Sequence, residues 1–418
     1  MIIGGPRLTG ISRRVDDNPS ARAPHILATS VHPLSAISGP TVRPASGIDI
    51  VYLWVDGNDS RWRAKRHRAM QKLSADATDD MAPFGNVEGR FRDNDELRYS
   101  LRALERFFPD HGHVYLVTDG QAPEWLRPST KLTLIDHRDL IPEASLPTFD
   151  SGNIESYIHR IAGLSERYFY FNDDVFFGAP VKVDDWFWPG GVYVAWSDEP
   201  EVTDEALRTD ATSLDNACRL SSQWLSAKAD AHGGSDGGAG RKIDPDYAHT
   251  FRTFAHSPRP MLKSLLLELE HEAPELFESV RSTVFRSWDK PTIVSDFVLR
   301  WALAHGVAQV RDYRHRYVST GADDQGAALD ALASEFGALD FFCINDTTDD
   351  AHPDDPRLKN AQDCLQSMLS KPSGFETIHR LPALAIGAAM NTTKEIHHGT
   401  TTDSNRHPHR RQRYYGPG

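Results

Sequence analysis

The sequence predicts an α/β fold built on a mostly parallel sheet. Short runs rich in β-branched and aromatic residues alternate with stretches of helical periodicity, and Gly, Pro or Asp bounds most of these runs. Strands separated by helices favour parallel pairing, because a parallel connection needs a crossover helix. The chain has 418 residues, of which 39% are hydrophobic. That length suggests about two or three domains' worth of sequence and a sizeable core.

Five apolar runs are the predicted strands: residues 50–55, 114–118, 132–136, 168–171 and 192–196. A helix is predicted before the second run, where Leu97, Leu101, Leu104 and Phe108 recur at helical spacing, and another before the fourth, where Ile154, Ile158, Ile161 and Leu164 repeat the pattern. Helical patterns return over residues 260–280 and 295–305. The C-terminal portion is therefore predicted to be mainly helical.

Composition divides the chain into five parts. Residues 1–46 and 377–418 are expected to be a flexible arm and a flexible tail, because they are rich in small and polar residues and lack a period. Residues 47–197 form the predicted α/β core. Residues 198–250, rich in Asp, Ser, Ala and Gly, are expected to form a mobile loop or lid, and residues 251–376 the helical portion that completes the site.

Charge and cysteine usage exclude several classes of protein. A formal net charge of −13, from 46 basic and 59 acidic residues, argues against nucleic-acid binding. No run reaches the roughly 18 apolar residues of a membrane span, and no secretory signal is evident, so a cytoplasmic location is expected. Arg410, Arg411 and Arg413 in the tail could contact the membrane's inner face, although a solvated tail is favoured. Three scattered cysteines indicate reduced, structural thiols, and nothing indicates an oligomeric state.

Acidic residues follow several predicted strands. The first strand continues into Asp56-Gly57-Asn58-Asp59, the second into Asp119-Gly120-Gln121 and the fourth into Asn172-Asp173-Asp174. Ligands of open parallel sheets bind beyond the carboxyl ends of the strands, and Mg²⁺ takes one or two carboxylates. Asp173 and Asp174 are therefore candidate ligands of a cation that holds a diphosphate, and the alternative is an ordinary turn.

Other polar residues admit two readings each. Glu155 and His159 are four residues apart on a predicted helix and could form a metal pair or a salt-bridged face. Segment 90–98 places three arginines at a predicted helix start, which suits a phosphate or a simple cap. His256 and Arg286 are isolated in the sequence, and a loop histidine and a surface arginine are their plain interpretations.

Four segments in this order resemble the conserved blocks of the Stealth family, which includes sugar-1-phosphate transferases of bacterial capsule synthesis and the catalytic subunit of lysosomal-enzyme N-acetylglucosamine-1-phosphotransferase. The segments are residues 48–62, 90–178, 254–287 and 341–350. The second is long and the most specific. Asn345 and Asp346 belong to the fourth.

The resemblance implies a Rossmann-like fold of the glycosyltransferase-A type and a divalent cation, Mg²⁺ or Mn²⁺. It further implies transfer of a sugar-1-phosphate from a UDP-sugar donor, such as UDP-N-acetylglucosamine, to a glycan acceptor, with release of UMP. Two alternatives remain open: a glycosyltransferase of the same architecture that releases UDP, and a catalytically inactive glycan-binding protein.

Motif positions in the family also imply residue roles. The implied catalytic residues are Glu155, Asp174, His256 and Arg286, with Asp173 and Asp174 as metal ligands. The residues implied to line the nucleotide and phosphate pocket are Asp56, Gly57, Arg92, Asn94 and Arg98.

Overall fold

The computed structural model describes residues 47–73, 78–232 and 241–377. All of them lie in the second of the two units into which the chain divides, residues 43–418. The predicted N-terminal arm and all but the first residue of the predicted C-terminal tail lie outside the described residues, Arg410, Arg411 and Arg413 among them.

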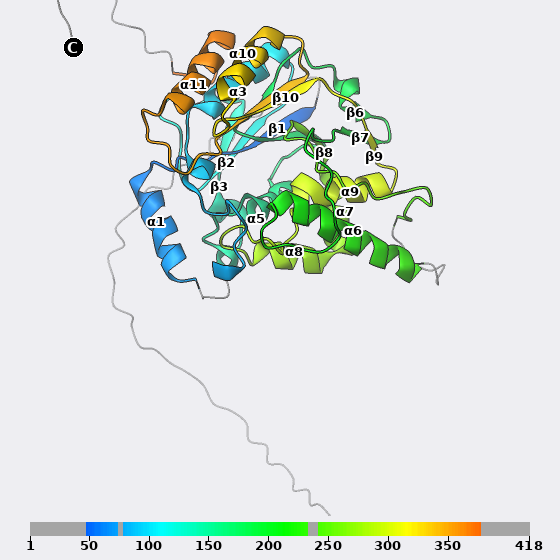
Figure 1. The fold of residues 1–418 in the computed structure, drawn as a ribbon. Helices are drawn as coiled ribbons and strands as arrows, with labels where there is room; N and C mark the ends of the chain where they lie inside the picture. Colours follow the sequence, from blue (N-terminus) through cyan, green and yellow to red (C-terminus); the bar gives the residue numbers. More distant parts are fainter. Residues whose placement is uncertain (1–46, 74–77, 233–240, 378–418) are drawn as a thin grey trace, which may run out of the picture. The chain divides into compact units, whose positions relative to one another are not determined.

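The main sheet has five strands in the order β3-β2-β1-β4-β8. They are β1 (Ile48–Leu53), β2 (Val114–Thr118), β3 (Leu132–Asp136), β4 (Arg167–Asn172) and β8 (Arg259–Leu262). β1 runs parallel to β2 and β4, β2 runs parallel to β3, and β8 is antiparallel to β4. This arrangement confirms the predicted α/β class with a mostly parallel sheet (Figure 1).

The central strands are buried along their length, whereas the edge strand is not. Every residue of β1 and β2 is buried, as expected for strands covered on both faces, whose sequences are continuously apolar. β3 lies at the edge of the sheet and is partly exposed. The bounds of β2 and β3 are the predicted ones.

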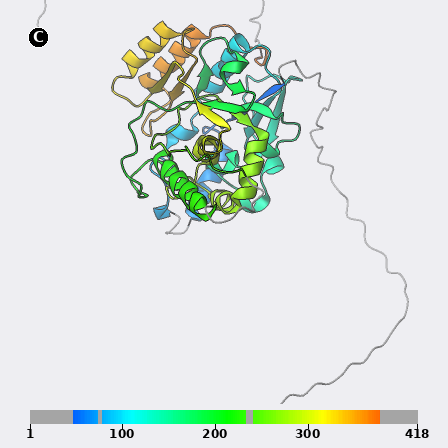
Figure 2. The ribbon, with the colours of Figure 1, turned by 90° about the vertical axis from the view of Figure 1, so that its right-hand side faces the viewer.

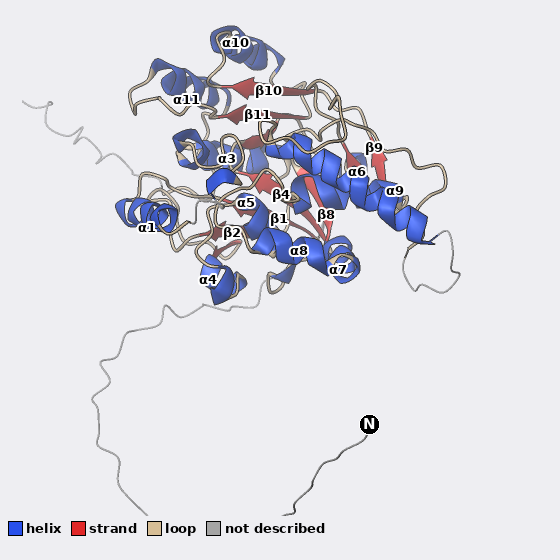
Figure 3. Cartoon of the chain, turned by 60° about the horizontal axis from the view of Figure 1, so that its bottom comes forward, coloured by secondary structure: helices blue, strands red, loops and turns tan. Residues whose placement is uncertain are grey.

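Two smaller sheets lie beside the main one (Figure 3). One has the order β10-β11-β5, with β5 (Val175–Phe177), β10 (His315–Ser319) and β11 (Phe341–Asn345); the other has the order β6-β7-β9, with β6 (Phe187–Trp188), β7 (Gly191–Val194) and β9 (Ala308–Val310). The predicted strand at 192–196 therefore belongs to a separate sheet. The C-terminal portion is helical as expected, but it also contributes β8 to β11, which the prediction did not include.

The helices cover both faces of the main sheet. α3 (Glu96–Phe107), α10 (Gln325–Glu335) and α11 (Pro356–Met368) lie on one side, and α5 (Ser151–Glu155), α7 (Lys263–Glu272), α8 (Pro274–Arg281) and α9 (Val298–Ala304) on the other (Figure 1). The remaining helices and single turns are α1 (Ser60–Gln71), α4 (His137–Leu140), α6 (Ser213–His232), the 3₁₀ turns η1 (Glu88–Phe91), η2 (Glu143–Ser145), η3 (Ile158–Arg160) and η4 (Val183–Asp185), and the π-helical turn η5 (Ile293–Phe297). No helix among the described residues has the length and apolarity to cross a bilayer.

The helix predicted over 154–164 is broken into α5 and η3. At the break, Arg281 donates from Nη2 to the carbonyl oxygen of Ser156 at 2.6 Å, and the backbone N–H of Arg160 bonds the carbonyl of Tyr157 at 2.8 Å, as in a 3₁₀ turn. Glu155 and His159 consequently do not form a metal pair on one helix face: His159 Nε2 pairs with Glu270 at 2.7 Å. The apolar residues of the pattern are nevertheless buried.

The predicted loop over 198–250 contains a 20-residue helix, α6. Its buried side chains are mostly small or polar: Ser213, Asn216, Ala217, Cys218, Arg219, Ser221, Ser222 and Leu225. α6 packs against η5 and α9 (Figure 2), and Ser221 donates to Asp296. The prediction of a mobile loop is wrong for this segment, because small residues carry little hydrophobic signal.

Candidate active site

A pocket of about 720 Å³ opens at the carboxyl ends of β1 and β4. Leu53 to Val55 line it from the end of β1 and Asn172 to Asp174 from the end of β4, and the sheet register pairs Leu53 with Asn172. Open parallel sheets bind ligands at this edge, and ligand pockets usually measure roughly 300–1,000 Å³. The predicted acidic segment thus lies in a cavity of ligand size.

Six of the predicted site residues line this pocket: Arg92, Glu155, Asp173, Asp174, His256 and Arg286. They come from the segment before α3, from α5, from the turn between β4 and β5, from the loop before β8 and from the segment after α8. The fold therefore brings together residues that are up to 194 positions apart, since Arg92 and Arg286 both reach the same cavity.

His256 lies between a carboxylate and a thiol. Its Nε2 is 3.7 Å from Asp174 Oδ1, and its Nδ1 is 3.4 Å from Sγ of Cys343 on β11. The thiol also donates to Asp174 Oδ2 at 3.4 Å. Burial lowers the pKa of His256, although the charge of Asp174 opposes this. The neutral imidazole is therefore the favoured form, and it can accept a proton.

Glu155 is buried at the end of α5, with 1% of its surface exposed. Its Oε1 accepts a hydrogen bond from the Tyr170 hydroxyl at 2.7 Å, whereas Oε2 has no hydrogen-bond partner among the described residues. Burial raises the pKa of Glu155, and the positive charge of Arg259 opposes the shift. The free oxygen can hold a proton or accept a hydrogen bond from a ligand.

Arg286 is fixed by the starts of two helices. Its Nε lies 3.4 Å from Asp150 Oδ1, the N-cap residue of α5, and its Nη1 lies 3.4 Å from Ser213 Oγ, the first residue of α6. The side chain also donates to Ser151. These contacts hold the guanidinium at the pocket wall, where 19% of the side chain remains exposed.

Arg90 and Arg259 also line the pocket. Sequence analysis placed Arg90 in a segment that suits a phosphate or a cap, and it gave Arg259 no role. Arg259 donates from Nη1 to Ser295 at 2.6 Å, while its Nε has no partner among the described residues. Arg90 Nε is also buried without a hydrogen bond in the described structure, and burial together with the charge of Arg286 lowers the pKa of Arg90 to about 9. Unused buried donors of this kind suit phosphate oxygens. Only its closeness in sequence to His256 could have indicated Arg259.

Asp173 faces a group of carboxyl groups. Burial raises its pKa well above the ordinary value, and the charges of Asp174, Glu96 and Asp93 add to this effect. The pKa of Asp93 is raised to about 7 and that of Glu96 to about 8, in each case by burial first and then by a neighbouring carboxylate. Asp174 Oδ1 accepts no hydrogen bond from any described residue. A cation close to these carboxyl groups would favour their ionised forms and oppose the shifts.

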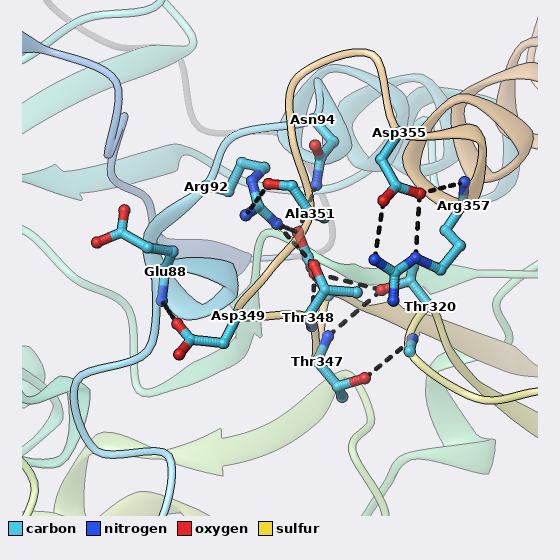
Figure 4. A network of polar contacts seen from close by, with 12 residues as sticks. Glu88, Arg92, Asn94, Thr320, Thr347, Thr348, Asp349, Ala351, Asp355 and Arg357 are labelled. Carbon is cyan, nitrogen blue, oxygen red and sulfur yellow. Dashed lines mark hydrogen bonds and ion pairs between the residues drawn. The ribbon is translucent and has the colours of Figure 1, made fainter.

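Arg92 is engaged by the loop that follows β11. Its Nη1 contacts Asp346 and donates to Thr348 Oγ1 at 2.9 Å, and its Nη2 donates to the carbonyl of Ala351 at 3.1 Å (Figure 4). Asn94 donates to the same Asp346 at 3.3 Å. These contacts join segments 90–98 and 341–350, two of the predicted blocks, and they leave few donors of Arg92 for a phosphate.

The other predicted nucleotide-binding residues are not among those that line the pocket; these are Asp56, Gly57, Asn94 and Arg98. Gly57 is needed for a close backbone approach, because a Cβ there would lie 2.1 Å from the carbonyl oxygen of Phe91. Arg98 pairs through Nε with Glu376 at 2.6 Å. Asp56 accepts from the backbone of Asn58 within its own turn. These contacts contribute to the fold, and a role of these residues in nucleotide binding stays a prediction.

Comparisons with known proteins agree with this arrangement. The family models of Stealth protein conserved regions 1 and 2 match residues 47–74 and 90–194. The exopolysaccharide phosphotransferase SCO6023 of Streptomyces coelicolor is 34% identical over 336 residues, which are 80% of this chain and 53% of that protein. The exopolysaccharide phosphotransferase CpsY of Mycobacterium tuberculosis is 32% identical over 333 residues, which are 79% of this chain and 58% of that protein.

Coverage differs among the relatives. The exopolysaccharide phosphotransferase SCO2592 of Streptomyces coelicolor is 31% identical over 338 residues, but these are 33% of its own length. The chain thus spans between a third and three fifths of these curated relatives. Among solved structures, the galactosyltransferase LgtC with donor and acceptor sugar analogues matches at a TM-score of 0.35 and 11% identity, over 78% of this chain and 98% of that chain. The chain thus carries Stealth protein conserved regions 1 and 2 in its α/β core and is similar to exopolysaccharide phosphotransferases over most of its own length.

Proposed function

We propose that this chain transfers a sugar-1-phosphate from a UDP-sugar, such as UDP-N-acetylglucosamine, to a glycan hydroxyl in capsule or exopolysaccharide synthesis. The observation that carries the proposal is the single pocket that gathers Glu155, Asp174, His256 and Arg286 from separate segments. The name shared by the relatives, exopolysaccharide phosphotransferase, fits a reaction of this class.

The reaction needs a base for the acceptor. The acceptor oxygen bonds to the β-phosphorus, the bond from that phosphorus to the bridging oxygen breaks, and UMP leaves with the bridging oxygen. His256 is suited to take the hydroxyl proton because burial favours its neutral form. Asp174, 3.7 Å from Nε2, would stabilise the imidazolium that results. Glu155 contacts Tyr170 rather than His256, which supports a role beside Arg259 and not the orientation of the histidine.

The arginines supply positive charge for the transferred group. Arg286 is held in place by Asp150 and Ser213, and Arg90 and Arg259 each keep an unused Nε donor. Phosphoryl transfer is promoted mainly by positioning and by charge stabilisation on the equatorial oxygens. Guanidinium groups fixed before the substrate arrives meet this requirement with little reorganisation.

A divalent cation, Mg²⁺ or Mn²⁺, fits the carboxylate group described above. Asp173 and Asp174 would hold it, because their neighbours Asp93 and Glu96 crowd them with negative charge and Asp174 Oδ1 is unpartnered among the described residues. When bound, such a cation neutralises diphosphate charge. The protein's own contribution is to keep the carboxylates together at the end of β4.

The nucleotide product tests the proposal. We would incubate the purified chain with UDP-N-acetylglucosamine, Mg²⁺ and a panel of polysaccharide fragments, then separate the nucleotides and examine the glycan by phosphorus NMR. We expect UMP and a phosphodiester signal. UDP without UMP would refute phosphoryl transfer and indicate a glycosyltransferase, while donor binding without any product would indicate a glycan-binding protein.

A matched pair of histidine variants tests the proposed base. His256→Gln should lower UMP formation by about 10²–10⁴-fold, the usual contribution of a general base. His249→Gln is the control, because His249 also contacts a buried cysteine, Cys218 at 3.6 Å, but does not line the pocket. Equal activity of both variants would remove His256 from the mechanism.

A further inference from the structure

We infer that Asp174, His256 and Cys343 form a binding site for a thiophilic divalent cation such as Zn²⁺. One oxygen, one nitrogen and one sulfur atom of these residues all lie within 4.8 Å of one another. The residues come from the β4–β5 turn, the loop before β8 and strand β11, so the fold brings together donors that are far apart in the sequence. The site shares Asp174 with the proposed Mg²⁺ site but differs from it in its donor atoms.

The spacing of the donors matches a tetrahedral metal centre. Cys343 Sγ is 3.4 Å from His256 Nδ1 and 3.4 Å from Asp174 Oδ2. Zinc bonds of about 2.3 Å to sulfur and about 2.0–2.1 Å to nitrogen or oxygen, at tetrahedral angles, separate such ligand atoms by about 3.5 Å. Sγ therefore lies near this spacing from the other two residues, and a cation would draw the nitrogen and oxygen donors, which lie within 4.8 Å of each other, to the same spacing.

Burial and chemistry favour a soft cation over Mg²⁺ at this position. Cys343 is 1% exposed and closes the site on the β11 side, whereas the side chains of Asp174 and His256 are 15% and 24% exposed and line the pocket. Three protein ligands with a fourth position open to a cavity are typical of zinc sites that also bind water or a substrate. Sulfur and imidazole donors select zinc, while Mg²⁺ requires oxygen.

The other two cysteines lack this combination. Cys218 contacts His249 Nε2 at 3.6 Å without a carboxylate to complete a group of three, and Cys364 donates weakly to the carbonyl of Leu329. Within residues 47–73, 78–232 and 241–377, the group at Cys343 is the one set of three such donors close enough to share an ion. Cys218 therefore provides a matched control.

Occupancy would block the proposed reaction. A cation bound here takes the imidazole nitrogen and a carboxylate oxygen of Asp174, and the Cys343 thiol releases its proton to solvent on binding. Zinc should consequently inhibit UMP formation even in excess Mg²⁺. This consequence rests on the proposed function, whereas cation binding itself does not.

Cobalt provides a direct readout of binding. The full chain, stripped of metal with a chelator, would be titrated with Co²⁺ and followed by absorption spectroscopy. We expect a thiolate-to-cobalt charge-transfer band that Zn²⁺ abolishes by displacement, that is retained in Cys218→Ser and that is absent from both Cys343→Ser and Cys343→Ala. A wild-type protein without the band, or a band that persists in the Cys343 variants, would overturn the inference.

Inhibition of UMP formation by Zn²⁺ is measured in a separate experiment. Each variant's UMP formation with Zn²⁺ is compared with its own rate without Zn²⁺, so a changed basal rate does not enter. Loss of an outer-shell partner already lowers metal affinity by about 10–100-fold, so loss of the Cys343 ligand should raise the inhibitory Zn²⁺ concentration by more than about 100-fold. Undiminished inhibition of Cys343→Ser would place the inhibitory zinc elsewhere. Absence of UMP from the wild type would contradict the proposed function and leave the cobalt result to decide the site.

Discussion

Replacing Glu376 with glutamine should destabilise the fold by about 3 kcal/mol. The carboxylate is 1% exposed and bridges two arginines of α3. Its Oε1 accepts from Arg102 Nε at 2.7 Å, and its Oε2 accepts from Arg102 Nη2 at 2.7 Å and from Arg98 Nε at 2.6 Å. In Glu376→Gln, an NH₂ group faces at least one of these guanidinium donors, and the buried positive charge loses its partner.

The magnitude follows from the pKa of the carboxyl group. Burial alone would raise it, but the hydrogen bonds from Arg102 and Arg98 lower the pKa of Glu376 from its ordinary value of 4.5 to about 2. At about 1.4 kcal/mol per pKa unit, this difference corresponds to about 3 kcal/mol in favour of the ionised form. Breaking a buried ion pair by removing one partner costs about 3–5 kcal/mol in general, which agrees.

Urea denaturation of the wild type and the variant at pH 7 and pH 4 measures the effect. Because the folded-state pKa is below the unfolded one, the stabilisation is complete well above pH 4.5 and is lost as the pH falls towards 2. At pH 4 the gap between the two proteins should be about 0.8 kcal/mol smaller. The control is Glu335→Gln, since Glu335 pairs with Arg316 while 41% exposed and should contribute at most about 1 kcal/mol. A gap at pH 7 no larger than that of the control would refute the reasoning.

Three further predictions concern two residues that line the pocket and one glycine that follows β1. Asp174→Asn, or removal of divalent cations by EDTA, should lower UMP formation by more than about 100-fold, because the proposed metal ligand or the metal itself is lost. The melting temperature of the variant should stay within a few degrees of the wild type, because Asp174 Oδ1 accepts no hydrogen bond among the described residues. Retained turnover would contradict this prediction. Arg90→Gln should reduce kcat/KM for the donor by about 10–100-fold, as expected for a charge-assisted hydrogen bond to phosphate, in steady-state assays. Gly57→Ala should lower the free energy of unfolding in urea by about 1–3 kcal/mol, because the new methyl group would overlap the Phe91 carbonyl; an unchanged value would show that the loop adapts.

Sequence periodicity predicted the parts of the fold that are continuous and apolar. β2 and β3 have the predicted bounds because β-branched runs between turn residues leave little ambiguity. The helix over 154–164 was predicted from the isoleucine spacing, and these isoleucines are indeed buried. The helix is nevertheless interrupted near Ser156, whose carbonyl oxygen accepts a hydrogen bond from Arg281. A side chain 125 positions away makes that contact, and no local pattern reports it.

A pocket residue could be predicted from the sequence where its place after a strand determines where it lies in the fold. Asp174 follows β4 directly, so its place at the sheet edge could be deduced from the sequence. Cys343 could not be identified, because its thiol meets Asp174 across 169 positions through the antiparallel pairing of β11 with β5. Arg98 was assigned to the nucleotide pocket from its motif position in the resemblance, whereas the structure pairs its Nε with Glu376.

The two kinds of charge around the pocket explain how a net-negative chain could hold a diphosphate. Burial first, and then the charges of neighbouring carboxylates, raise the pKa of Asp93, Glu96 and Asp173, and a bound cation would oppose this shift. The buried Nε donors of Arg90 and Arg259 have no partner among the described residues, and the side chain of Arg286 is 19% exposed at the pocket wall. A cation bound without an anion would leave these donors unsatisfied. Under the proposed function, a diphosphate bound together with a divalent cation would neutralise the carboxyl groups and satisfy the arginine donors. The acidic strand ends and the buried arginines would then be complementary halves of one binding site.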